Sequence, residues 1–112
     1  MHAWDLRGLE ARDGLAPEVL ASDDGARAIG IALAPGQELD EHQVRERAWL
    51  LVVDGRVEVE TRDRGCAATA GTLVTFDPGE RHAVRSAEGA RLLLFLTPWP
   101  APGHYRLDET RR

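Results

Sequence analysis

The sequence is poor in the features that mark secreted and membrane proteins. It has one cysteine, Cys66, so no disulfide can form within the chain, and no activating base stands near it in the sequence. No apolar run approaches the length of a membrane span, and the N-terminal segment lacks the basic and apolar regions of a signal peptide. We therefore expect a cytoplasmic protein in a reducing compartment.

A basic surface is also missing. The sequence has 14 lysine and arginine residues against 19 acidic ones, which gives a formal net charge of -5. Nucleic-acid-binding domains usually show a basic patch, and proteins held at membrane surfaces a polybasic segment. Because both kinds of charge are interleaved along this chain, we expect neither nucleic acid nor a membrane among its partners.

Amphipathic helices are missing too, since no window of a dozen residues has apolar residues at helical spacing. Short apolar runs alternate instead with turn-like pairs, a rhythm typical of a sandwich or barrel. The pairs are Asp24-Gly25, Pro35-Gly36, Asp54-Gly55, Arg64-Gly65, Pro78-Gly79 and Glu88-Gly89. At 112 residues the chain fits one domain. We predict a single all-β domain over 1–112, with its barrel core at about 18–97 and an extended, proline-rich tail at 98–112.

Apolar periodicity locates the expected strands. Over 56–61, valines alternate with acidic residues, which indicates one buried and one solvated face. Asp54-Gly55 precedes this segment and is a strong hairpin signal, so we predict a turn between it and a strand at 48–53. The other expected strands cover 18–22, 26–33, 37–44, 66–69, 72–76, 82–86 and 92–96.

Two of the expected strands, 48–53 and 92–96, are apolar on both faces. A strand of this kind needs cover on both sides. Either the two strands are central in the sheet, or a second subunit covers them, and in the latter case they form the contact of a homodimer.

Two histidines stand in similar surroundings, because His42 and His82 each lie on an expected strand that follows a Pro-Gly turn. The spacing around them resembles the two sequence motifs of the cupin superfamily. Gly36, His42 and Gly55 match the first motif, and Gly71, Gly79 and His82 match the second. The resemblance covers residues 26–97 and implies a double-stranded β-helix, a jelly-roll-like barrel that is commonly a homodimer.

The departures from these motifs concern the metal ligands. In metal-binding cupins, the ligands stand at positions that match His42, Val44, Ala48 and His82 here. Two of these four residues are apolar, the proline of the second motif stands one place late at Pro78, and its asparagine is Ser86. The resemblance therefore implies the fold and weakens the implied metal site.

A carboxylate could complete a site of two histidines and one acid, an arrangement known for ferrous iron. Asp40 lies two residues before His42, on the same face of an extended strand. Glu46 lies four residues after His42, about 13 Å along a strand, so only a sharp turn at 45–47 could return it. We expect such a turn to point Glu46 to solvent. Asp40 and Glu46 are thus the candidate third ligands.

Three functions follow for the interior. The first is a small cupin that binds a small organic ligand, anionic or carbonyl-bearing, in an apolar pocket with His42 and His82 as polar anchors and metal weak or absent. Val44, Ala48 and Val84 would supply the apolar contacts. The second is a metal-dependent enzyme of dioxygenase or isomerase type, with His42 and His82 holding iron, manganese, zinc or nickel. The third is a non-catalytic interaction or structural protein.

Overall fold

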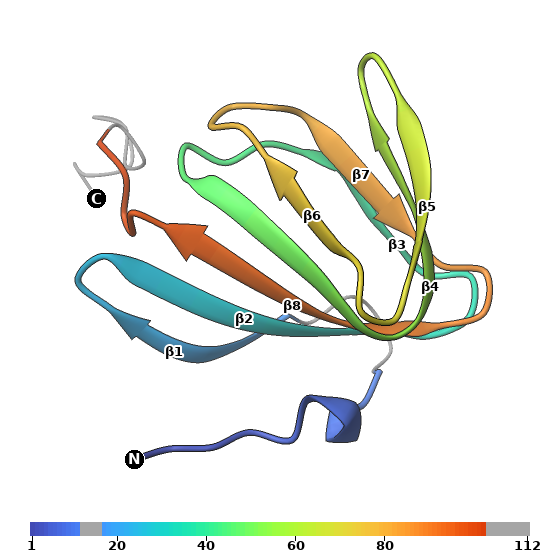
Figure 1. The fold of residues 1–112 in the computed structure, drawn as a ribbon, viewed down its shortest axis with the longest axis horizontal. Helices are drawn as coiled ribbons and strands as arrows, with labels where there is room; N and C mark the ends of the chain where they lie inside the picture. Colours follow the sequence, from blue (N-terminus) through green and yellow to red (C-terminus); the bar gives the residue numbers. More distant parts are fainter. Residues whose placement is uncertain (12–16, 103–112) are drawn as a thin grey trace, which may run out of the picture.

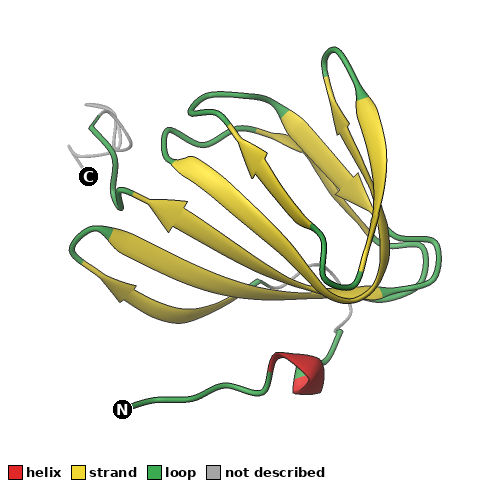
Figure 2. Cartoon of the chain, in the orientation of Figure 1, coloured by secondary structure: helices red, strands yellow, loops and turns green. Residues whose placement is uncertain are grey.

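The computed structural model describes residues 1–11 and 17–102, with the backbone alone at 40–42. Within these residues almost all regular structure is β, apart from a short 3₁₀ helix, η1 (Leu6–Gly8) (Figures 1 and 2). The strands are β1 (Glu18–Asp23), β2 (Ala26–Leu33), β3 (Glu38–His42), β4 (Arg47–Thr61), β5 (Gly65–Thr69), β6 (Leu73–Phe76), β7 (His82–Arg85) and β8 (Ala90–Thr97). The predicted all-β fold is confirmed, and the part of the expected tail beyond residue 102 lies outside the described residues.

The strands form two antiparallel sheets that share β4. The first sheet has the order β1-β2-β8-β4-β6 and uses the first part of β4. The second has the order β3-β7-β4-β5 and uses the last part of β4. Figure 1 shows the chain curling through β4 from one sheet into the other. This is the double-stranded β-helix that the sequence implies.

The predicted hairpin at Asp54-Gly55 is wrong. The strand β4 runs without reversal for 15 residues, and its register with β8 shifts between Val52 and Asp54. Gly55 has a φ of 86°, and a Cβ there would clash with the carbonyl oxygen of Gly89. A glycine of positive φ serves a β-bulge as well as a tight turn, and the bulge here bends β4 from the first sheet into the second.

The interior between the sheets is almost entirely apolar. Alternate residues of each strand point inward, as the two-residue period of a strand requires. In the two central strands these are Ala48, Leu50, Val52, Val57 and Val59 of β4, and Ala90, Leu92, Leu94 and Leu96 of β8. β4 and β8 are paired neighbours in the middle of the first sheet, as one of the two alternatives expects, whereas the contact of a homodimer stays a prediction.

The outer face of the first sheet is covered over only part of its area. The N-terminal segment lies along the β1–β2 side (Figure 1), where Leu9 packs over Gly30 and its carbonyl accepts a hydrogen bond from Arg91 Nε at 2.7 Å. On the β4–β8 side, the paired residues Trp49 and Phe95 remain 38% and 37% exposed. None of the helices in the described residues is long and apolar enough to cross a membrane.

Candidate functional site

His82 is the first residue of β7 and lies in the barrel interior. It follows the Pro78-Gly79 turn, as expected, and its side chain is only 3% exposed. The imidazole stacks on the ring of Phe76, with centroids 3.9 Å apart and planes 7° from parallel. Packing thus fixes the plane of the ring, while the backbone fixes its rotation, since Nδ1 lies 3.1 Å from the carbonyl oxygen of Glu80.

The contact with Glu80 defines the chemistry of the His82 ring. A carbonyl oxygen only accepts hydrogen bonds, so Nδ1 carries the proton that this contact needs. In the neutral ring, Nε2 then bears the lone pair that can accept a hydrogen bond or coordinate a metal. A backbone carbonyl that orients a histidine in this way is a common feature of binding and metal sites.

The register of β3 and β7 brings the two histidines of the motifs together. The Cα of His42 pairs with the Cα of His82, at the end of β3. The side chains of His42, Asp40 and Glu41 lie outside the described part of the structure. The shared interior position of His42 and His82, and the role of Asp40 as a ligand, therefore stay predictions.

The expectation that Glu46 points to solvent is wrong. The chain does bend at Arg45 and Glu46, just before β4, but Glu46 is 0% exposed. Its Oε2 accepts a hydrogen bond from the backbone N–H of Ala101 at 2.9 Å. Glu46 shares the inward parity of Ala48 and Leu50, a signal that could have placed it inside. The segment after β8 then covers it.

The three apolar candidates, Val44, Ala48 and Val84, are buried or half-buried. Ala48 and Val84 are buried, at 0% and 1% exposure, and the half-buried Val44 packs against the core. Ala48 pairs with Phe76 on one side, and Phe76 carries the His82 ring. Among the described side chains, the interior at this end of the barrel combines aliphatic walls with the imidazole of His82 and the carboxyl group of Glu46.

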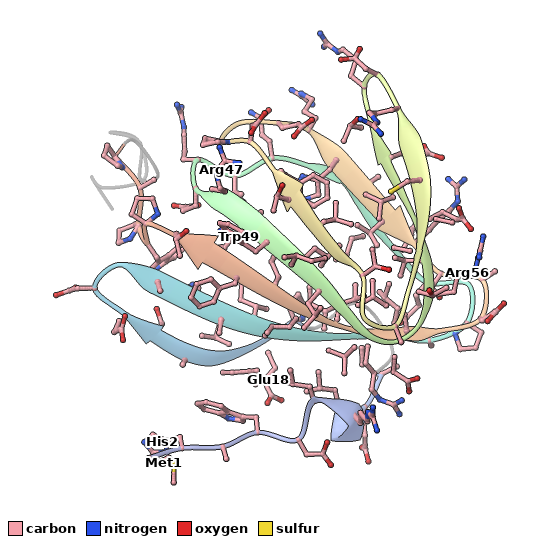
Figure 3. The ribbon with its side chains drawn as sticks, in the orientation of Figure 1. Met1, His2, Glu18, Arg47, Trp49 and Arg56 are labelled. Atoms are coloured by element: carbon pink, nitrogen blue, oxygen red, sulfur yellow. The ribbon has the colours of Figure 1, made fainter. Side chains whose placement is uncertain are left out.

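The arginines near this end lie at the surface. Arg47 pairs with Asp77 at 3.0 Å, and Arg85 pairs with Glu60 at 2.8 Å, with all four side chains at least 40% exposed. Exposed pairs of this kind contribute little to stability. Both arginines therefore belong to the solvated surface, and Figure 3 shows Arg47 at the start of β4.

Ser86, which stands where the second motif has asparagine, belongs to the opposite end of the barrel. Its hydroxyl donates to the carbonyl oxygen of Arg56 at 2.6 Å and accepts from the N–H of Gly89 at 2.9 Å. Both contacts join backbone segments, so Ser86 holds the barrel together and takes no part in the candidate site.

A family model described as a cupin domain matches residues 31–97. The chain belongs to the cupin family. A Klebsiella pneumoniae protein with a double-stranded β-helix domain has a TM-score of 0.81 and 16% identity to this cupin, over 90% of this chain and 93% of that one. A Thermus thermophilus protein has a TM-score of 0.77 and 24% identity, over 88% and 98%. These likenesses show the fold alone, and no curated protein is significantly similar in sequence to this cupin.

The four-ligand set of metal-binding cupins does not fit this interior. Two of its positions are occupied by Val44 and Ala48, which pack into the hydrophobic core and have no donor atoms. Among the described side chains, no group of three histidine, cysteine or acidic residues is placed to hold a metal ion. The candidate ligands that remain are His82 and Glu46, together with His42 and Asp40, whose side chains lie outside the described part of the structure.

Proposed function

We propose that this cupin binds a small organic ligand in the barrel interior, with His42 and His82 as its polar anchors and metal weak or absent. The observation that carries the proposal is the buried ring of His82, held by Phe76 and by the Glu80 carbonyl. An imidazole fixed in plane, rotation and tautomer can orient one polar atom of a ligand.

The surroundings of His82 support the same conclusion. Small-molecule sites are mostly apolar cavities with a few placed polar groups. Ala48, Val44 and Val84 provide apolar walls where metal-binding cupins have two further donors. The proposed ligand is therefore held by apolar contact and by a small number of hydrogen bonds, and not by a tightly bound metal.

The test is to purify the protein without chelators and without an affinity metal column, then to measure metals and co-purifying small molecules by elemental analysis and native mass spectrometry. We expect an organic ligand whose retention falls in His82→Ala and in His42→Ala. Stoichiometric iron, manganese, zinc or nickel that is lost in His82→Ala would overturn the metal-free proposal. Unchanged ligand and metal contents in both variants would overturn both functions.

A metal-dependent enzyme is the second candidate, and the burial of Glu46 favours it. Two histidines and one carboxylate are sufficient ligands for ferrous iron in other folds. Glu46 is wholly buried at the end of the barrel where His82 lies, so it could act as the third ligand beside His42 and His82. The elemental analysis distinguishes this candidate, since Glu46→Gln would then lower the metal content while leaving the fold intact.

We also propose that this cupin is a homodimer that pairs through the outer face of its first sheet. Trp49, Phe95 and Leu73 are exposed there, and Leu73 is 55% exposed. At the two ends of this face lie one ion pair each, Arg47 with Asp77 and Arg91 with Asp54. An apolar strip between charged ends is a patch that the same patch of a second copy can cover about a two-fold axis.

A further inference from the structure

The segment after β8 is fastened to the barrel by side chains. Trp99 packs against the hydrophobic core, and the Arg27 guanidinium lies 3.9 Å from the centre of its ring. The carbonyl oxygen of Trp99 accepts a hydrogen bond from the N–H of Gly25 at 2.9 Å. Ala101, only 8% exposed, donates its backbone N–H to Glu46 at 2.9 Å. Residues 98–102 thus form an ordered strap.

The strap lies at the end of the barrel that carries the candidate site. Thr97 pairs with Arg47, so the chain leaves the first sheet beside the start of β4, next to Glu46. Figure 1 shows this segment rising from the end of β8 near the point where β4 begins. One pair further along, Ala48 lies between Leu96 and Phe76, on which His82 stacks. The strap therefore lies beside the strand pairs that lead to His82.

We propose that residues 98–102 are a latch that closes the interior site, and that the ligand opens it by competing with Ala101 for Glu46. The closing of the barrel is independent of any ligand, whereas the competition rests on the proposed ligand-binding function. The contact that breaks is the hydrogen bond from the Ala101 N–H to Glu46 Oε2.

The physical basis is the difference between the strap and the sheets. The described strap contacts are made by side chains and by single hydrogen bonds at Trp99 and Ala101, whereas β8 pairs along its length with both β2 and β4. Segments with few contacts open at a smaller free-energy cost than the strands of a sheet, without global unfolding. The strap can therefore open while the barrel stays folded.

The chemistry of the latch also names the ligand class. Ala101 offers Glu46 a hydrogen-bond donor, so a competitor must offer one as well. A hydroxyl or an amine can do so, whereas a carboxylate has acceptors only. We infer an apolar ligand that carries a hydroxyl or an amine group, in contrast to the anionic or carbonyl ligand expected from the sequence.

The first experiment measures access to the site without a ligand. The full chain is treated with diethyl pyrocarbonate, and the modification of His82 is followed by peptide-resolved mass spectrometry. Ala101→Pro removes the donor of the latch, and Trp99→Ala removes its anchor. We expect both variants to speed the modification of His82 about tenfold, because a lost buried contact of this kind shifts local opening by that order.

Three controls separate local opening from a weakened fold. Ala101→Gly keeps the N–H, and Ser86→Ala weakens the opposite end of the barrel, so both should leave the His82 rate within about twofold of the parent. His2 lies exposed near the N-terminus and should react equally in all variants. An unchanged His82 rate in Ala101→Pro and Trp99→Ala, with both variants folded, would overturn the latch. An equal rise in Ser86→Ala would do the same.

The second experiment tests the ligand class by hydrogen exchange of residues 98–102. Since prolines have no amide hydrogen, the exchange of this segment reports only on Trp99 and Ala101. Benzyl alcohol, benzylamine and benzoate have the same ring and differ in the polar group. We expect the alcohol and the amine to speed exchange at least about threefold and benzoate to leave it unchanged, as partial displacement of Ala101 requires.

Glu46→Gln keeps an acceptor for Ala101, and His82→Phe removes the anchor of the ligand. The response to the alcohol and the amine should disappear in His82→Phe and persist in Glu46→Gln. If benzoate acts as strongly as the alcohol, or none of the three acts, the competition is wrong although the latch stands. Suppose that Ala101→Pro speeds the modification of His82, and that benzyl alcohol and benzylamine still speed exchange in His82→Phe. The proposed role of His82 as a ligand anchor is then wrong, whereas the latch is supported.

Discussion

The two ends of the barrel use buried polar residues in opposite ways. At one end, the hydroxyl of Ser86 joins Arg56 to Gly89, and its backbone is bonded to Gly36 and Gln37. At the other end, Glu46 accepts a hydrogen bond from the Ala101 N–H and His82 contacts the Glu80 carbonyl, and both side chains lie in the interior. The first end is built to stay closed. The second holds the groups with which we propose that a ligand interacts when the strap opens.

In this fold, the polar residues that join backbone segments and those that we propose bind a ligand lie at different ends of the barrel. Buried backbone carbonyl and N–H groups need hydrogen-bond partners. At one end of the barrel, the Ser86 hydroxyl is the partner of both the Arg56 carbonyl and the Gly89 N–H. At the other end, the buried polar groups are a carboxyl and an imidazole, which can also bind or coordinate a ligand. Substitutions at the two ends should therefore differ in what they damage.

The largest loss of stability should come from Gly55→Ala at the closed end. The positive φ of Gly55 and the clash of a Cβ with the Gly89 carbonyl together should cost at least about 3 kcal/mol. Gly71→Ala is the matched control, because its φ is also positive but nothing lies within 4 Å of a Cβ there. It should cost about 1–2 kcal/mol. Urea unfolding at one protein concentration measures both, and equal losses would contradict the role of the bulge.

The next largest effect should come from Ser86→Ala. Without the hydroxyl, the N–H of Gly89 and the carbonyl of Arg56 lose a common partner, which should cost about 1–3 kcal/mol. Ser86→Thr keeps the hydroxyl and should recover part of the loss. Ligand retention at the opposite end should not change in either variant. A variant that keeps its stability but loses ligand would reverse the assignment of the two ends.

The sequence predicts local turns better than the path of the long strands. The glycines at Gly36, Gly71 and Gly79 have positive φ in the structure, and local turn chemistry is sufficient to expect this. At Gly55 the same signal is misleading, because a bulge and a hairpin both need positive φ. Only the pairing of β4 with strands of both sheets decides between them, and that pairing depends on residues far away in the chain.

The burial of Glu46 escapes sequence-based prediction for a related reason. Glutamate is almost always exposed, so a bend before a strand predicts a solvated side chain. Glu46 accepts a hydrogen bond from Ala101, which lies 55 residues away in the chain, and nothing in the sequence links the two residues. Similarly, the partner that orients His82 is a carbonyl, which every residue has. The motif spacing predicts that His42 and His82 lie near each other, whereas the groups around them can be identified only from the folded structure.

A smaller change in stability should accompany His82→Phe at the open end. Phenylalanine keeps an aromatic ring against Phe76 and has no nitrogen to bury, so stability should change by less than about 1 kcal/mol. Ligand retention should nevertheless be lost, since Nε2 is absent. Phe76→Leu is the converse control, because it keeps the imidazole but removes the stacked ring. If His82→Phe destabilises as much as Ser86→Ala, the imidazole is a structural group and the contrast between the ends fails.

The smallest effect on the folded protomer should come from Phe95→Glu on the outer face. An exposed position away from caps and turns should tolerate the change within about 0.5 kcal/mol. In a homodimer, however, two glutamates near a two-fold axis would repel each other across an apolar contact, and the dimer should dissociate at micromolar concentration. Sedimentation velocity measures this directly. Val19→Glu, at 50% exposure on β1, is the control that should leave the dimer intact. If the parent protein sediments as a monomer, the proposed dimer contact is wrong, and no second copy covers Trp49 and Phe95.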